Sequence, residues 1–261
     1  MTVAPPRIHR LGGVGEPALL LHGFGSDRLS WMANQHDLAG VVDVHALDLP
    51  GHGDEPFSGD GGIEALAEAV AASLDASGIA GVHVVGHSLG GAVAMALAAR
   101  DPARVKSLVL IAPAGLGRGI DAAFLEAFPA AETAETMEPL LHRLVSRPRL
   151  VNRHMVARAL EFLDRPGRRE GLSRIAAGLA DVGVMEEPTR AVAAGDVPRL
   201  VVWGGADRIN PIDEGRLKAF GGDLLTIEDA AHMPHVEAFK AVNERLVSFL
   251  AGQSGAGIGR G

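Results

Sequence analysis

Short apolar runs alternate with longer segments of helical periodicity along most of the chain. Six runs are too short for helices and almost continuously apolar, which is typical of strands buried on both faces of a parallel sheet. The expected strands are Ala18–Leu21, Val41–Leu47, Val82–Val85, Val105–Ile111, Leu200–Trp203 and Leu224–Ile227. The expected helices are Gly62–Ser77, Leu89–Arg100, Pro211–Phe220 and Val236–Leu250. This alternation predicts an α/β fold, with a mostly parallel sheet and crossover helices on both of its faces.

Two stretches depart from this alternation. Residues 114–195 show helical periodicity without a convincing strand, which predicts a helical insertion between two strands of the sheet. Residues 251–261 are rich in glycine and are expected to form a flexible tail. The core of the fold is therefore expected to consist of residues 1–113 and 196–250.

Composition narrows the function classes. The chain has 261 residues, 47% of them apolar and 21% charged, as expected for a globular protein. It has no cysteine, which excludes thiolate catalysis, disulfides and cysteine-ligated metals. The net charge of −8 disfavours a nucleic-acid partner. No run approaches the length of a membrane span and the N-terminal residues lack the apolar core of a signal peptide, so we expect a cytoplasmic protein without a membrane partner.

The strongest chemical signal is a serine in a glycine-flanked turn. Residues Gly86–Gly90 read Gly-His-Ser-Leu-Gly, and they lie between an expected strand and an alanine-rich helix. A tight strand-to-helix turn of this kind lifts the serine hydroxyl above the sheet and places it at a helix N-terminus, where developing negative charge is favoured. The pattern predicts that Ser88 is a nucleophile.

A serine nucleophile needs a base, and the base needs an orienting carboxylate, in the chain order Ser, acid, His for this kind of fold. Asp207 follows one expected strand and His232 follows the next, so both should lie at the carboxyl edge of the sheet with Ser88. His235 is a weaker candidate for the base because it begins a helix. Asp213 and Asp196 are better interpreted as capping or surface groups.

The loop after the first expected strand offers an oxyanion hole. Its sequence is His-Gly-Phe-Gly, and the Phe24 N–H together with the Leu89 N–H would supply two donors above Ser88. His22, His52 and His87 are expected to support these loops by packing. The histidines are scattered, without the spacing of metal ligands, so no metal or other cofactor is expected.

Together, these motifs resemble the α/β-hydrolase superfamily over nearly the whole chain. The matching segments are His22–Gly25, Asp48–Gly53, Gly86–Gly91, Trp203–Asp207 and Ala231–Pro234. The resemblance implies that residues 114–195 form a cap over the active site. Dehalogenases and epoxide hydrolases of this superfamily use an aspartate nucleophile, and epoxide hydrolases also use cap tyrosines. Position 88 is serine and the chain has no tyrosine, so neither class fits.

A closer similarity is to the hydrolase-like domain of the acetoin dehydrogenase E2 component, a dihydrolipoamide acetyltransferase. It is carried by Leu110–Gly117, Leu150–Arg153 and the spacing through the cap. Such E2 chains usually carry a lipoyl domain with an Asp-Lys-Ala turn. None of the three lysines here lies in such a turn, so we expect no lipoyl domain in this sequence and a lipoyl-domain protein as a candidate partner.

Two acyl-transfer functions share one mechanism through an acyl-enzyme on Ser88. Water as acceptor gives an esterase or thioesterase, whereas a thiol gives an acyltransferase, with coenzyme A or lipoamide as candidate acyl acceptor or donor. A carbon–carbon bond hydrolase of vinylogous diketones would use the same triad. A ligand-binding protein that keeps the fold without catalysis is the remaining alternative.

The insertion carries candidate substrate-binding residues. Between residues 143 and 174 the chain has nine arginines and three acidic residues, which favours an anionic substrate at Arg168 and Arg169 or, alternatively, a solvated helical surface. Phe124, Phe128 and Phe162 are candidates for an apolar acyl pocket, although their helical spacing also fits packing against the core.

Overall fold

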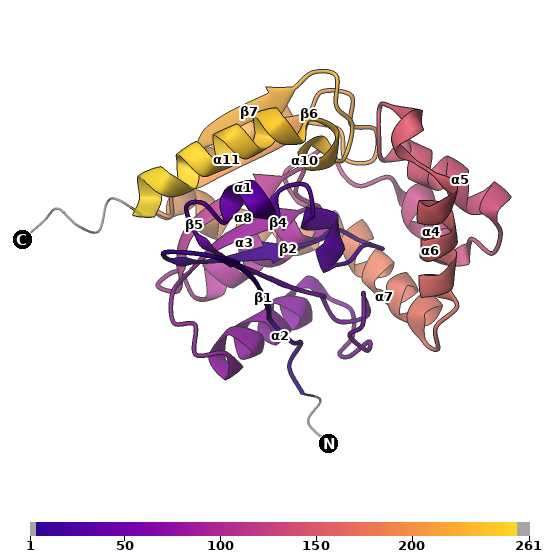
Figure 1. The fold of residues 1–261 in the computed structure, drawn as a ribbon, viewed down its shortest axis with the longest axis horizontal. Helices are drawn as coiled ribbons and strands as arrows, with labels where there is room; N and C mark the ends of the chain where they lie inside the picture. The colour runs from indigo at the N-terminus through magenta and orange to yellow at the C-terminus, as the bar shows by residue number, and fades with distance from the viewer. Residues whose placement is uncertain (1–3, 255–261) are drawn as a thin grey trace, which may run out of the picture.

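A seven-stranded sheet lies at the centre of the molecule in the computed structural model, which describes residues 4–254 (Figure 1). The strand order is β1-β3-β2-β4-β5-β6-β7; β1 pairs with β3 in antiparallel fashion and the other neighbouring strands are parallel. The strands are β1 (His9–Gly13), β2 (Pro17–Leu21), β3 (Asp43–Leu47), β4 (Val82–His87), β5 (Val105–Ile111), β6 (Arg199–Gly204) and β7 (Asp223–Ile227). The mostly parallel sheet predicted from the sequence is confirmed.

Helices cover both faces of this sheet. Since successive residues of a strand point to opposite sides, each strand contributes side chains to both core layers. In β2, Leu19 and Leu21 belong to the core layer shared with helices α2 and α3, whereas Ala18 and Leu20 belong to the layer shared with α11. All four side chains are fully buried. The continuous apolar runs of the sequence thus reflect burial on two sides.

The helices of the core agree with most of the expected segments. They are α1 (Gln35–Leu38), α2 (Ile63–Ala76), α3 (Leu89–Arg100), α9 (Glu214–Phe220), α10 (Pro234–Glu237) and α11 (Phe239–Ser254), with a 3-10 turn η1 (Arg28–Trp31). The single helix expected over Val236–Leu250 is in fact two helices, which meet at Ala238. The α11 helix continues to Ser254, so residues 251–254 of the expected tail are helical. Residues 255–261 lie outside the described part of the chain.

One strand was missed by the sequence interpretation. Strand β1 has the sequence His-Arg-Leu-Gly-Gly, which lacks an apolar run because the strand lies half-exposed at the edge of the sheet. Gly12 and Gly13 have φ angles of 117° and 114°, and the pairing with β3 is irregular between Arg10 and Gly12. In a sequence, two adjacent glycines usually indicate a loop. Here their positive φ angles accommodate a bulge within a strand.

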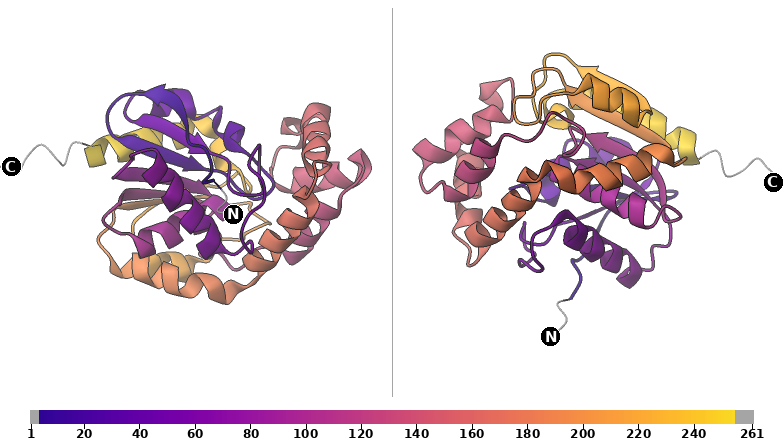
Figure 2. Two further views of the ribbon diagram at one scale, coloured as in Figure 1. Left: turned by 90° about the horizontal axis from the view of Figure 1, so that it is seen from below. Right: turned by 180° about the vertical axis from the view of Figure 1, so that it is seen from behind.

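Between β5 and β6 the chain is helical. This interstrand segment contains α4 (Ala122–Ala130), α5 (Ala134–Arg143), η2 (Pro148–Leu150), α6 (Arg153–Leu163), α7 (Arg168–Ala180), η3 (Val182–Met185) and α8 (Glu186–Ala194). Helices α4, α5 and α6 stand apart from the sheet, and α7 leads back toward it (Figures 1 and 2). The last helix, α8, packs against α3 and therefore belongs to the core layer rather than to the projecting part.

Candidate active site

Ser88 lies on a sharp turn between β4 and α3. Its backbone has φ 52° and ψ −112°, an unfavourable conformation for a residue other than glycine, and it is the residue immediately before the first turn of α3. A Cβ atom on Gly90 would lie 2.2 Å from the Leu21 carbonyl oxygen, so the helix can approach β2 only with glycine there. Backbone strain at a helix N-terminus is typical of a residue held for chemistry.

Asp207 and His232 form a buried hydrogen-bonded pair at the ends of β6 and β7. His232 Nδ1 lies 2.8 Å from Asp207 Oδ2, and the side chains are 4% and 0% exposed. The other carboxylate oxygen of Asp207 accepts hydrogen bonds from the Ile209 and Asn210 N–H groups, both at 2.9 Å. Since the carboxylate accepts from Nδ1, Nε2 of a neutral His232 is left as the basic nitrogen.

Two further buried histidines pack beside His232. The His87 ring lies 4.9 Å from that of His232 and 4.5 Å from that of His235, and His87 Nε2 donates to the His232 carbonyl oxygen at 2.9 Å. Burial lowers the pKa of His87 well below its usual value, and burial lowers the pKa of His235 to about 3. Both rings are therefore neutral near pH 7, and His235 packs on Trp31 instead of Asp207. The prediction of His87 as a packing residue agrees with this arrangement.

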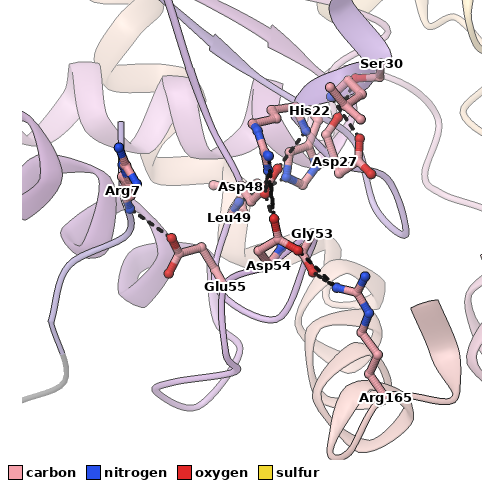
Figure 3. Close-up of polar contacts among 12 residues, drawn as sticks. Arg7, His22, Asp27, Ser30, Asp48, Leu49, Gly53, Asp54, Glu55 and Arg165 are labelled. Carbon is pink, nitrogen blue, oxygen red and sulfur yellow. Dashed lines mark hydrogen bonds and ion pairs between the residues drawn. The ribbon is translucent and has the colours of Figure 1, made fainter. Parts of the chain in front are cut away.

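The loop after β2 lies directly against Ser88. A Cβ atom on Gly23 would be 2.7 Å from His87 Nδ1 and 3.4 Å from the Ser88 Cβ atom, so this approach needs glycine. His22 fixes the loop, because its Nδ1 donates to the Gly23 carbonyl at 2.9 Å and its Nε2 accepts from the Leu49 N–H at 3.0 Å (Figure 3). Burial lowers the pKa of His22, in keeping with a neutral ring that donates and accepts.

The loop after β3 joins this arrangement to the interstrand segment. Asp48 is buried and accepts from the Arg28 N–H at 2.7 Å, and it also pairs with the Arg28 guanidinium group. Arg165, between α6 and α7, reaches across to Asp54 at 3.2 Å (Figure 3). The hydrogen bond from Arg165 lowers the pKa of the Asp54 carboxyl group. These contacts connect the projecting helices to the loops beside Ser88.

A cavity of about 410 Å³ opens above Ser88. Ser88, His87 and His232 line it from the sheet side, and Phe24 lines it from the loop after β2. The sequence-predicted residues Phe124, Phe128 and Phe162 line the same cavity from the interstrand segment. Volumes of about 300–1,000 Å³ are usual for small-molecule sites.

The structure places Arg168 and Arg169 away from this cavity. Arg168 is buried, donates to the Gly53 carbonyl at 3.1 Å and to the Glu55 carbonyl, and lies 5.4 Å from the centre of the Phe162 ring. Arg169 donates to the Pro129 carbonyl at 2.8 Å and to the Ala131 carbonyl at 2.6 Å. Both guanidinium groups thus bind backbone carbonyl groups.

Other residues at the site were missed by the sequence interpretation. Arg158 lines the cavity and pairs with Asp27 at 2.6 Å. Asn210 is buried and donates to the Ala112 and Pro113 carbonyls, at 3.1 and 2.8 Å, which ties the Asp207 loop to the end of β5. Asn210 follows Asp207 by three residues, and this closeness was the only sequence signal.

The described residues hold neither a metal centre nor a membrane span. Within residues 4–254, no group of three or more His, Asp or Glu side chains is placed to bind a metal ion. In the same range, no helix combines the length and apolarity needed to cross a bilayer.

Known sequences similar to this chain include a family model and two bacterial proteins of the same name. Residues 17–239 match the family model described as alpha/beta hydrolase fold. The chain is 41% identical over 246 residues to the dihydrolipoyllysine-residue acetyltransferase component of the acetoin cleaving system of Pseudomonas putida, covering 94% of this chain and 66% of that protein. The protein of the same name in Cupriavidus necator is 36% identical, with the same two shares. The chain thus spans slightly less than two thirds of the length of both relatives.

An esterase is also among the relatives. The pimeloyl-[acyl-carrier protein] methyl ester esterase of Neisseria meningitidis serogroup A is 35% identical over 242 residues, covering 85% of this chain and 74% of the esterase. Among solved structures, a meta-cleavage product hydrolase from Pseudomonas fluorescens superposes with a TM-score of 0.82 at 22% identity, covering 95% of this chain and 96% of that one. At this identity the superposition supports the fold alone.

Proposed function

The chain belongs to the α/β-hydrolase fold family, and we propose that it is a serine-dependent acyl-transfer enzyme in which Ser88 is the nucleophile, His232 the base and Asp207 the orienting acid. One observation carries the proposal: His232, paired with the buried Asp207, lines the same cavity as a serine held in a strained conformation at a helix N-terminus. Nucleophile, base and orienting carboxylate are the three groups that acyl transfer through a serine requires.

Acylation would begin with the free Nε2 of His232. This nitrogen takes the hydroxyl proton while Ser88 Oγ bonds to the carbonyl carbon of the substrate, and the C=O electron pair moves onto oxygen. The Phe24 and Leu89 N–H groups are the proposed donors to that oxyanion. When the intermediate collapses, the bond to the leaving alcohol or thiol breaks, and the protonated His232 returns the proton to it. The acyl group remains on Ser88 as an ester.

The second half of the cycle decides between hydrolase and transferase. Water or a thiol gives up its proton to His232, attacks the Ser88 ester and releases an acid or a new thioester. Coenzyme A or dihydrolipoamide would serve as the thiol, the latter carried by a lipoyl-domain protein. Two relatives named as acetyltransferase components favour the thiol acceptor, and the relative named as a methyl ester esterase favours water.

The lining of the cavity favours an apolar acyl group. Aromatic side chains surround the space above Ser88, and Phe24 meets Phe128 with ring centres 5.8 Å apart. Phe124 lies against Phe128 at 5.7 Å. An acyl chain without charge would bury its surface there at no cost in unpaired charge. This apolar cluster is the proposed site for an uncharged part of the substrate, such as its acyl group.

Partition of the acyl-enzyme tests the proposal. The protein is mixed with p-nitrophenyl acetate, with and without dihydrolipoamide or coenzyme A, and both nitrophenol release and the acetyl products are followed. Rapid release of acetate without thiol supports an esterase, whereas release that accelerates with thiol and yields a thioester supports a transferase. A Ser88→Ala variant that turns over the ester as the wild type does would contradict the proposal.

A further inference from the structure

A buried carboxylate lies next to the proposed base and takes no part in the steps above. Glu237 is the last residue of α10, five positions after His232, and its carboxylate is 1% exposed. Its Oε1 atom accepts the Ala231 N–H at 2.7 Å, so it holds the backbone immediately before His232. A buried carboxylate without partners would be costly, and this one is fully engaged.

The other oxygen of Glu237 binds the interstrand segment. Its Oε2 atom accepts from the Ser146 N–H at 2.8 Å and from the Ser146 hydroxyl at 2.7 Å. Ser146 lies between α5 and η2, and its hydroxyl also contacts the Asp229 carbonyl in the loop before His232. The Arg147 Nε atom is 3.9 Å from the same carboxylate oxygen and supplies a positive charge.

One carboxylate therefore spans two parts of the molecule that are 91 residues apart in sequence. On one side is the loop that presents His232, and on the other is the segment that covers the cavity with its phenylalanines. Only a carboxylate of this length offers two acceptor oxygens to three donors in this position. The hydrogen bonds to an ionised group are also stronger than those between neutral groups.

We propose that Glu237 is a positioning residue for His232, and that through Ser146 it makes the alignment of His232 with Ser88 depend on a seated interstrand segment. The proposal rests on the function proposed above. Displacement of α5 and α6 would remove Ser146 from Glu237 and loosen the loop that carries His232. Ser88 would then be acylated efficiently only while the interstrand segment covers the cavity and excludes bulk water from it.

Three substitutions test the contacts of Glu237 with Ala231 and with Ser146 separately. Glu237→Gln keeps an acceptor for Ala231 but turns an amide donor toward the Ser146 N–H. Glu237→Asp keeps the charge, but its carboxylate is one methylene shorter and reaches one partner only. Ser146→Ala removes the hydroxyl and leaves the backbone N–H in place. The matched controls are Glu244→Gln, an exposed carboxylate on α11, and Ser173→Ala, an exposed serine on α7.

The readout is the rate constant of acylation per active site, taken from the burst with p-nitrophenyl acetate and normalised to the burst amplitude. We expect about a 10- to 100-fold fall in Glu237→Gln and Glu237→Asp, as misalignment of a base typically causes, and a smaller fall in Ser146→Ala. KM for the ester should change little, because neither Glu237 nor Ser146 lines the cavity. Neither control should change the rate or KM.

A merely structural role would lower the melting temperature and the burst amplitude but not the normalised rate. Normal acylation rates in both Glu237 variants and in Ser146→Ala would overturn the proposal. If the Glu237 variants do not fold, Ser146→Ala decides alone, and a rate equal to that of Ser173→Ala overturns it. Wild-type turnover that does not need Ser88 would instead reject the proposed function, so the two failures are distinguishable.

Discussion

His87 donates a hydrogen bond from Nε2 to the main-chain carbonyl of His232 at 2.9 Å, and so joins the turn of Ser88 to the loop of the proposed base. The two residues are 145 positions apart in the chain. Together with the Asp207 contact, this bond holds His232 at its ring and at its backbone.

Asp207→Asn should remove most activity with little change in structure. The asparagine oxygen can still accept from the Ile209 and Asn210 N–H groups, but its amide group faces His232 Nδ1 and favours the wrong tautomer. We expect kcat to fall about 10⁴-fold with p-nitrophenyl esters. Asp213→Asn, at the N-cap of α9, is the matched control and should leave kcat unchanged and stability nearly so, because asparagine also caps a helix N-terminus.

Gly23→Ala should impair catalysis through a steric effect. The added methyl group would lie 2.7 Å from His87 Nδ1, closer than atoms of this kind approach, so the loop must move away from Ser88. We expect kcat/KM to fall about 10- to 100-fold, with an unchanged far-ultraviolet circular dichroism spectrum. A matched control is Gly252→Ala in α11, where the methyl group meets nothing within 4 Å. Equal activity of the two variants would contradict the role of the Gly23 loop.

Stability should fall as the pH drops below about 6.5. Burial lowers the pKa of His235 to about 3 in the folded protein, so the unfolded chain binds a proton that the folded chain does not. The contribution of His235 to the free energy of unfolding is therefore fully present above its pKa in the unfolded chain. This contribution is lost progressively as the pH falls to about 3. At pH 4.5 His235 alone would cost about 2–3 kcal/mol, and His22, His52 and His87 act in the same direction.

Urea unfolding between pH 7.5 and 4.5 measures this loss. The exposed His154 provides a control, since His154→Gln should leave the pH dependence unchanged. Removal of a buried titrating group, as in His235→Asn, should flatten the curve even if it lowers stability at pH 7.5. A free energy of unfolding that stays constant over this range would show that these rings ionise without penalty.

Arg158 and Arg169 should differ in their effects. Arg158→Ala leaves the carboxylate of Asp27 unpaired at the lining of the cavity, so KM for an ester with a carboxylate on its acyl group should rise severalfold, whereas KM for a neutral ester should change little. Arg169→Ala leaves two carbonyl groups, those of Pro129 and Ala131, without their donor, and should lower stability by about 1–3 kcal/mol with KM unchanged. Steady-state kinetics with charged and neutral esters, together with thermal melts, test both. A raised KM for charged esters in Arg169→Ala would place that residue at the substrate after all.

Much of the sheet could be predicted because buried parallel strands need continuous apolar residues. Strand β5 was predicted over the same residues, Val105–Ile111, that form it. Strand β1 could not be predicted, since an edge strand with two glycines at positive φ has no apolar pattern. Turn chemistry made the candidate residues Ser88, Asp207 and His232 recognisable, because each lies just after an apolar strand.

The rest of the site depends on contacts that local sequence does not encode. Glu237 and Ser146 meet only because the interstrand segment folds back onto the loop of His232. Arg168 and Arg169 stand in an arginine-rich stretch that suggests anion binding, whereas their guanidinium groups bind carbonyl groups of other segments. Which arginine faces a cavity is decided by the packing of α6 and α7, and a charge count along the chain cannot supply that information.

Mass spectrometry of the acyl-enzyme tests the central claim most directly. The protein is quenched with acid within the burst of p-nitrophenyl acetate turnover, digested and mapped. The account predicts one acetylated peptide, modified at Ser88, that is absent from Ser88→Ala and decays as turnover proceeds. Acetylation elsewhere in the chain with Ser88 unmodified, or unchanged turnover in Ser88→Ala, would contradict it.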